Sequence, residues 1–79
     1  MKKKEIIEKL TEIFRMTFND PELVLNEEMN AGDVETWDSL THMLMVSEVE
    51  SQFGIRFKLK ELNQLKTVGD IVNTLEEKL

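Results

Sequence analysis

The stretch from Trp37 to Gly54, WDSLTHMLMVSEVESQFG, decides the fold. Asp38 is a residue type that caps helix N-termini, and glycine readily takes the left-handed conformation that ends many helices. Between these two signals we predict a helix from Ser39 to about Gln52. This helix carries apolar residues on two faces, whereas an ordinary amphipathic helix has one.

At roughly 100° per residue, one face should pack into the core and comprises Met45, Val46, Val49 and Phe53. The opposite face, close to Ser39, comprises Leu40, Met43 and Leu44. Exposed apolar patches often mark interaction sites. The sequence leaves two interpretations open: the preceding loop covers this second face with Trp37 or Met29, or the face is a docking surface or the mouth of an apolar cavity.

Two further amphipathic helices flank this one. The first has an apolar stripe with Ile7 at its edge, and the stripe comprises Ile6, Leu10, Ile13, Phe14 and Phe18. This helix should end near Asn19, because Pro21 disfavours a helical conformation in the residue before it. The last begins with the capping box of Thr67 and Asp70. Its expected apolar face is Val68, Ile71, Val72, Leu75 and Leu79.

The two connections differ in character. We expect residues 21–37 to form a long loop with at most one helical turn, attached to the core by Leu23, Val24, Leu25 and Met29. Loops of this length inside a compact domain often carry function. The loop's NEEMNAGD segment does not have the spacing of a calcium loop, because Gly32 is preceded by Glu27, Met29 and Ala31 rather than by three oxygen ligands. Ile55, Phe57 and Leu59 alternate as in a strand, but no second strand exists to pair with, so we expect an extended connection followed by a short helix with Leu62 and Leu65 inward.

The predicted fold is therefore all-α: a small antiparallel bundle of three main helices plus one short helix, with a long loop between the first and second helices, in a single domain over residues 1–79.

Sixteen acidic and ten basic residues give a net charge of −6, which disfavours nucleic acid as a partner. Cysteine is absent, there is one histidine, and no apolar stretch could span a bilayer. We expect no metal site, no membrane insertion and a cytoplasmic location.

Ser39, His42 and Asp38 superficially form a serine hydrolase set. An aspartate adjacent to the serine on the same turn is badly placed to orient the imidazole, so we do not expect catalysis. An exposed hydroxyl at a helix N-terminus is better suited to carry a phosphodiester, because free backbone N–H groups and the helix dipole would stabilise the phosphate.

The segments WDSLTHMLMVSEVESQFGIRF and ELNQLKTVGDIVNTLEEKL resemble the acyl carrier protein family, and the similarity runs in order along essentially the whole chain. The resemblance implies a non-catalytic, monomeric carrier with 4′-phosphopantetheine attached to Ser39 by a phosphopantetheinyl transferase, assisted by Asp38 and Leu40. The arm's thiol would hold an acyl group as a thioester for loading and accepting enzymes with basic or apolar docking patches. The implied docking residues are Leu40, Met43, Leu44 and Glu48. The implied lining of an acyl cavity is Met43, Met45, Val46, Phe53, Ile55 and Ile71.

Two departures from the carriers of primary fatty acid synthesis point to a specialised pathway. Leu44 stands where an acidic residue is usual, and Trp37 where a small residue is usual. Within the carrier class the cargo could instead be an amino acid or a polyketide unit. A cofactor-free helical interaction module that docks through Leu40, Met43 and Leu44 is the alternative from another class.

Overall fold

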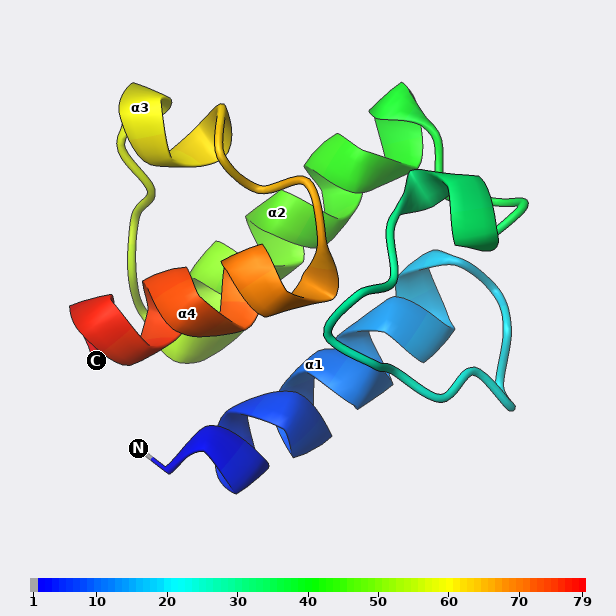
Figure 1. The fold of residues 1–79 in the computed structure, drawn as a ribbon, viewed down its shortest axis with the longest axis horizontal. Helices are drawn as coiled ribbons and strands as arrows, with labels where there is room; N and C mark the ends of the chain where they lie inside the picture. The colour runs from blue at the N-terminus through cyan, green and yellow to red at the C-terminus, as the bar shows by residue number, and fades with distance from the viewer. Residues whose placement is uncertain (1) are drawn as a thin grey trace.

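The computed structural model describes residues 2–79 and confirms the all-α prediction. Across that range there is no strand, and the only β-type pairing is an isolated bridge between Asn30 and Thr67. No helix in the described range is long and apolar enough to cross a membrane. The elements in chain order are α1 (Lys3–Thr17), the 3₁₀ turn η1 (Ala31–Asp33), α2 (Ser39–Phe53), α3 (Leu59–Leu62) and α4 (Val68–Lys78) (Figure 1).

Helix α1 packs against both α2 and α4. Figure 1 shows α2 and α4 running back against the direction of α1, so that the chain ends lie at the same end of the molecule, while α3 lies on the side away from α1. Helices whose apolar stripes face one another in this way bury a common core. The antiparallel arrangement and the short third helix agree with the prediction.

The expected stripe of α1 is fully buried from Ile6 to Phe14, and Phe18 just beyond the helix is 1% exposed. Asn19 takes a positive φ of 52°, which asparagine tolerates better than most residues. The chain therefore turns out of the helix before Pro21, as the proline requires.

The predicted end signals of α2 are both used. Asp38 caps the helix through its side chain, and Gly54 ends it in the left-handed conformation at φ 66°, ψ 37°. The face predicted to enter the core is buried throughout, with exposures of 0–8%: Met45, Val46, Val49 and Phe53.

The long loop is attached to the start of α4 through its backbone. The N–H of Val68 donates to the carbonyl of Met29, and the N–H of Gly69 donates to the carbonyl of Glu27, each at 2.9 Å. These bonds satisfy helix N–H groups that have no partner within the helix. Thr67 accepts from the N–H of Asp70, as predicted. Leu79 was wrongly expected on the buried face; it is 43% exposed because it lies at the chain end beyond α4.

The loop returns to the core at Trp37, which is 4% exposed. Its indole ring stacks on Phe18 and meets Phe14 edge to face, with centroid distances of 5.3 Å in both cases. Met29 and Val34 are also buried. Val24 was wrongly expected to attach the loop to the core: its side chain is 72% exposed, while its neighbours Leu23 and Leu25 pack against the core.

Candidate functional site

Ser39 is the first residue of α2 and is exposed. Its position is set by Asp38, whose Oδ1 accepts hydrogen bonds from the N–H groups of Leu40 at 3.0 Å and Thr41 at 2.9 Å. Thr41 closes the cap by accepting from the N–H of Asp38 at 2.8 Å. This reciprocal cap holds the serine on a defined first turn, with its hydroxyl accessible to another protein.

The cap changes one expectation. Backbone N–H groups at this helix N-terminus were expected to be free to stabilise a phosphate, but those of Leu40 and Thr41 are already bonded to the Asp38 carboxylate. Hydrogen bonding by Thr41 lowers the pKa of Asp38, so this carboxylate is charged at neutral pH. Its second oxygen, Oδ2, takes no part in the cap bonds, which all use Oδ1.

A groove of about 370 Å³ opens beside Ser39. It is bordered by the loop, by the first turn of α2 and by the segment that leads into α4. Its lining is Asn30, Ala31, Gly32, Trp37, Asp38, Ser39, His42, Leu65 and Lys66. A group bonded to the serine oxygen therefore has open space and a cationic side chain within the same groove.

Sequence reasoning did not place Leu65 and Lys66 near Ser39. The signal that joins them is the pairing of Asn30 with Thr67, which draws the loop against the chain just before α4. The residue types of this pair, asparagine and threonine, do not predict that the two residues are in contact.

His42 and Asp38 do not form a hydrolase triad with Ser39. In a triad the histidine Nδ1–H donates to the acid. Here Nδ1 of His42 instead accepts from the indole Nε1–H of Trp37 at 3.0 Å, and Asp38 is engaged in the helix cap. No group of three potential metal ligands occurs within residues 2–79.

The second apolar face of α2 is exposed. Leu40 is 70% exposed, Met43 52% and Leu44 55%. The loop does not cover this face: Trp37 and Met29 both lie in the core instead, so that interpretation is wrong. Glu48, the fourth expected docking residue, is half-buried and accepts a hydrogen bond from the amide of Gln52 at 3.0 Å.

The expected cavity lining is mostly brought together. Met45, Val46, Phe53 and Ile71 belong to one buried cluster, and Ile55 packs against it. Met43 was wrongly placed in this set: it points to solvent from the opposite face of α2 and belongs only with the exposed residues.

Comparison with known proteins decides what this site belongs to. The family described as "Phosphopantetheine attachment site" matches residues 8–75. The chain belongs to this acyl carrier protein family. Acyl carrier proteins of Thermotoga maritima and Petrotoga mobilis are 34% and 35% identical to it, over 98% and 100% of this chain and 95% and 93% of theirs.

Solved structures agree. The holo acyl carrier protein of Geobacter metallireducens is 42% identical and superposes with a TM-score of 0.85, over 91% of this chain and 83% of that one. A Mycobacterium tuberculosis protein at 19% identity, covering 92% of this chain and 97% of its own, shares the fold with a TM-score of 0.82.

Acyl carrier proteins are not enzymes; they carry a covalent 4′-phosphopantetheine, which supplies a thiol on a long flexible arm. They are served by a phosphopantetheinyl transferase and by enzymes that handle acyl groups. The exposed hydroxyl of Ser39 beside an open groove fits attachment of such an arm.

Proposed function

We propose that this chain is a stand-alone carrier whose 4′-phosphopantetheine arm is attached to Ser39, and that it serves a specialised assembly pathway. The observation that carries the proposal is the placement of Ser39 itself: an exposed hydroxyl, fixed on the first turn of α2 by the Asp38 cap, at the edge of an open groove. The proposed carrier is one domain over residues 1–79, a monomer, and cytoplasmic.

Ser39 and Asp38 have distinct roles in loading. Ser39 supplies the oxygen that becomes bonded to the phosphorus of the arm, while the pyrophosphate P–O bond of coenzyme A breaks, adenosine bisphosphate leaves and the serine proton passes to a base of the transferase. Asp38 keeps the serine in place through Oδ1, and its charged Oδ2 remains as a ligand atom for the magnesium that the transferase brings. Leu40 lies beside them and is 70% exposed, which suits contact with the transferase.

Docking of acyl-loading and acyl-accepting enzymes involves the exposed apolar face of α2. From Ser39 to Ser47 the helix has no Asp, Glu, Lys or Arg, so the complementary surface on a partner is apolar rather than basic at this point. Leu40, Met43 and Leu44 form the centre of this surface, and Glu48 lies at its edge. The exposed Leu44 is the residue that supports a specialised partner most directly.

The cargo is an acyl chain that can be sheltered among the side chains of the core. Met45, Val46, Phe53 and Ile71 belong to one buried cluster, Ile55 packs against it, and together they offer an apolar lining. An aminoacyl or polyketide cargo would use the same arm and the same serine. The carrier confines its cargo to a tether and so raises its effective concentration at each partner enzyme.

The decisive experiment is modification in vitro. The purified protein is incubated with coenzyme A and a promiscuous phosphopantetheinyl transferase, and its intact mass is recorded. The proposal predicts the gain of one phosphopantetheinyl group by the parent and none by Ser39→Ala. An unchanged parent mass, with a transferase that modifies a known carrier in the same tube, would instead favour a cofactor-free interaction module.

A further inference from the structure

Helix α3 is held differently from the other helices. Helices α1, α2 and α4 each bury at least four side chains, whereas none of the four residues of α3 is buried. Leu59 is 75% exposed, and only Leu62 packs partly against the core. Within α3 itself little apolar surface is buried, although Phe57 before it and Leu65 after it belong to the core. Polar contacts therefore add to these two anchors in holding the helix.

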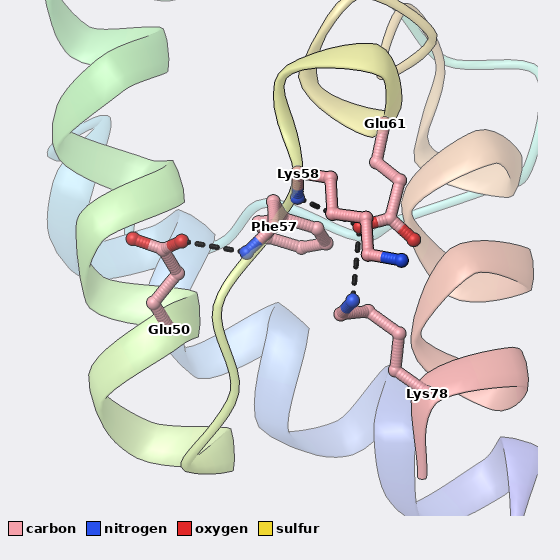
Figure 2. A network of polar contacts seen from close by, with 5 residues as sticks. All are labelled: Glu50, Phe57, Lys58, Glu61 and Lys78. Atoms are coloured by element: carbon pink, nitrogen blue, oxygen red, sulfur yellow. Dashed lines mark hydrogen bonds and ion pairs between the residues drawn. The ribbon is translucent and has the colours of Figure 1, made fainter.

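Two carboxylates brace α3 and the linker before it (Figure 2). Glu50, on α2, accepts from the N–H of Phe57 at 2.8 Å. Glu61 accepts from the N–H of Lys58 at 2.8 Å and from Nζ of Lys78, on α4, at 2.9 Å. The Glu61–Lys78 ion pair thus joins α3 to the last turn of α4, and its side chains are only 18–22% exposed.

The hydrogen bond from the backbone of Lys58 and the contact with Lys78 lower the pKa of Glu61. The carboxylate is therefore charged under ordinary conditions and the ion pair is formed. Partly exposed pairs of this kind are held weakly, so a modest competing interaction can open one.

The braced segment shares the core with the apolar residues that line the proposed cargo site. Phe57, next to the Glu50 contact, is 6% exposed and belongs to the same buried cluster as Met45 and Ile71. Protein interiors are close-packed, so an acyl chain can enter this cluster only if an element moves. Helix α1 closes one side by packing on α2 and α4. Helix α3 lies on the other side and has no buried residue of its own; its apolar anchors are Phe57 and Leu65, at its two ends.

We propose that the Glu61–Lys78 ion pair is a latch that holds α3 over the core, and that sheltering of the cargo requires the latch to open. The cargo half of this statement rests on the function proposed above, because the acyl chain must arrive on an arm from Ser39. The latch itself does not depend on the arm.

Three variants separate the latch from a general loss of charge. Lys78→Met removes the cation but keeps an apolar stem, Lys78→Arg keeps the cation, and Lys3→Met breaks the exposed Lys3–Glu27 ion pair instead. Hydrogen exchange is first measured on unmodified protein, at the amides of Leu62 and Asn63, which donate to the carbonyls of Lys58 and Leu59.

We expect Lys78→Met to speed exchange at these amides about three- to fivefold relative to those of α1. Lys78→Arg and Lys3→Met should leave them at the parent rate. If Lys78→Met exchanges at the parent rate, or if Lys3→Met speeds α3 equally, the latch does not exist.

The cargo half is tested on protein loaded with an octanoyl thioester, by NMR contacts between the chain and the Ile71 methyl groups. A looser latch should increase the sheltered population about threefold in Lys78→Met and not in the two controls. Faster exchange at α3 with an unchanged sheltered population would overturn the link to cargo. Failure of the proposed function is distinguishable, because the protein would then gain no mass on attempted loading.

Discussion

The indole Nε1–H of Trp37 donates a hydrogen bond to Nδ1 of His42 at 3.0 Å, and the two rings lie within 9° of parallel. Because Nδ1 is the acceptor, the neutral imidazole must carry its proton on Nε2. Burial lowers the pKa of His42 below its ordinary value of 6.5, so the neutral form prevails at pH 7. This bond connects the first turn of α2, next to Ser39, to the aromatic core.

Replacing Trp37 by phenylalanine keeps a core ring and removes the N–H donor. A hydrogen bond accepted by the neutral imidazole disfavours its protonation, so Trp37→Phe should raise the pKa of His42 toward its ordinary value. An NMR titration of the imidazole, the only one in the chain, measures this directly. Phe18→Leu disturbs the same ring cluster without removing the donor and serves as the control. A pKa that is unchanged or lower in Trp37→Phe would show that the bond is not formed in solution.

The same histidine makes stability depend on pH. Since its folded-state pKa is lowered, the unfolded chain binds the proton more readily, and stability is lost as the pH falls below about 6.5. Above that range the contribution is fully present. His42→Gln should therefore flatten the dependence of unfolding free energy on pH just below about 6.5, as measured by urea unfolding at a series of pH values. The parent and the variant should have equal slopes well above pH 6.5, where the imidazole is neutral in both the folded and the unfolded state; equal slopes just below pH 6.5 would contradict the assignment.

Gly69 lies close to the backbone of the long loop, so the absence of a side chain at this position of α4 has a structural reason. A Cβ added there would lie 3.0 Å from the carbonyl oxygen of Glu27, which is itself bonded to the Gly69 N–H. Gly69→Ala gains up to about 1 kcal/mol in helix propensity but incurs an overpacking cost of about 1–3 kcal/mol against an immobile backbone atom. We expect net destabilisation of about 1 kcal/mol, equivalent to a Tm lower by about 4–8 °C.

Thermal unfolding followed by circular dichroism measures this change. Asn73→Ala, at an exposed position of the same helix, gives the effect of helix propensity without the close approach and should be neutral or stabilising. A Gly69→Ala variant as stable as the parent would show that the loop moves away from α4 without cost.

The exposed face of α2 should be sensitive to charge. Leu44→Glu places a carboxylate on the apolar docking surface, and we expect kcat/KM for the transferase or for a native partner enzyme to fall about five- to tenfold, as for loss of a moderate hot-spot contact. Leu59→Glu, at an even more exposed leucine of α3, is the matched control and should have no effect. Circular dichroism must show equal helical content in both variants. Equal kinetics for both would mean that partners dock elsewhere.

The helices and the core could largely be predicted because each signal is local. Stripes at helical spacing, the caps at Asp38 and Thr67, and the terminator Gly54 all act within a few residues of the helix they define, and the structure uses all of them. The extended connection after Gly54 was also anticipated, from the lack of a partner strand.

The contacts between distant segments could not be predicted in the same way. Neither the ring stack of Trp37 on Phe18 nor the pair of Glu61 with Lys78 has a sequence signature, because each depends on how two elements are packed. The same limit led to the mistaken idea that Trp37 covers the outer face of α2. Met43 was assigned to both the surface and the cavity, and only the fold separates the two.

The central claim is that the arm is attached to Ser39, and peptide mapping tests it most directly. The chain has three serines, Ser39, Ser47 and Ser51, all on α2 and all exposed, so Ser47→Ala and Ser51→Ala are matched controls. After treatment with coenzyme A and transferase, fragmentation mass spectrometry should place a single phosphopantetheinyl group on Ser39 in the parent and in both controls, with none in Ser39→Ala. A group found on Ser47 or Ser51, or retained in Ser39→Ala, would contradict the account.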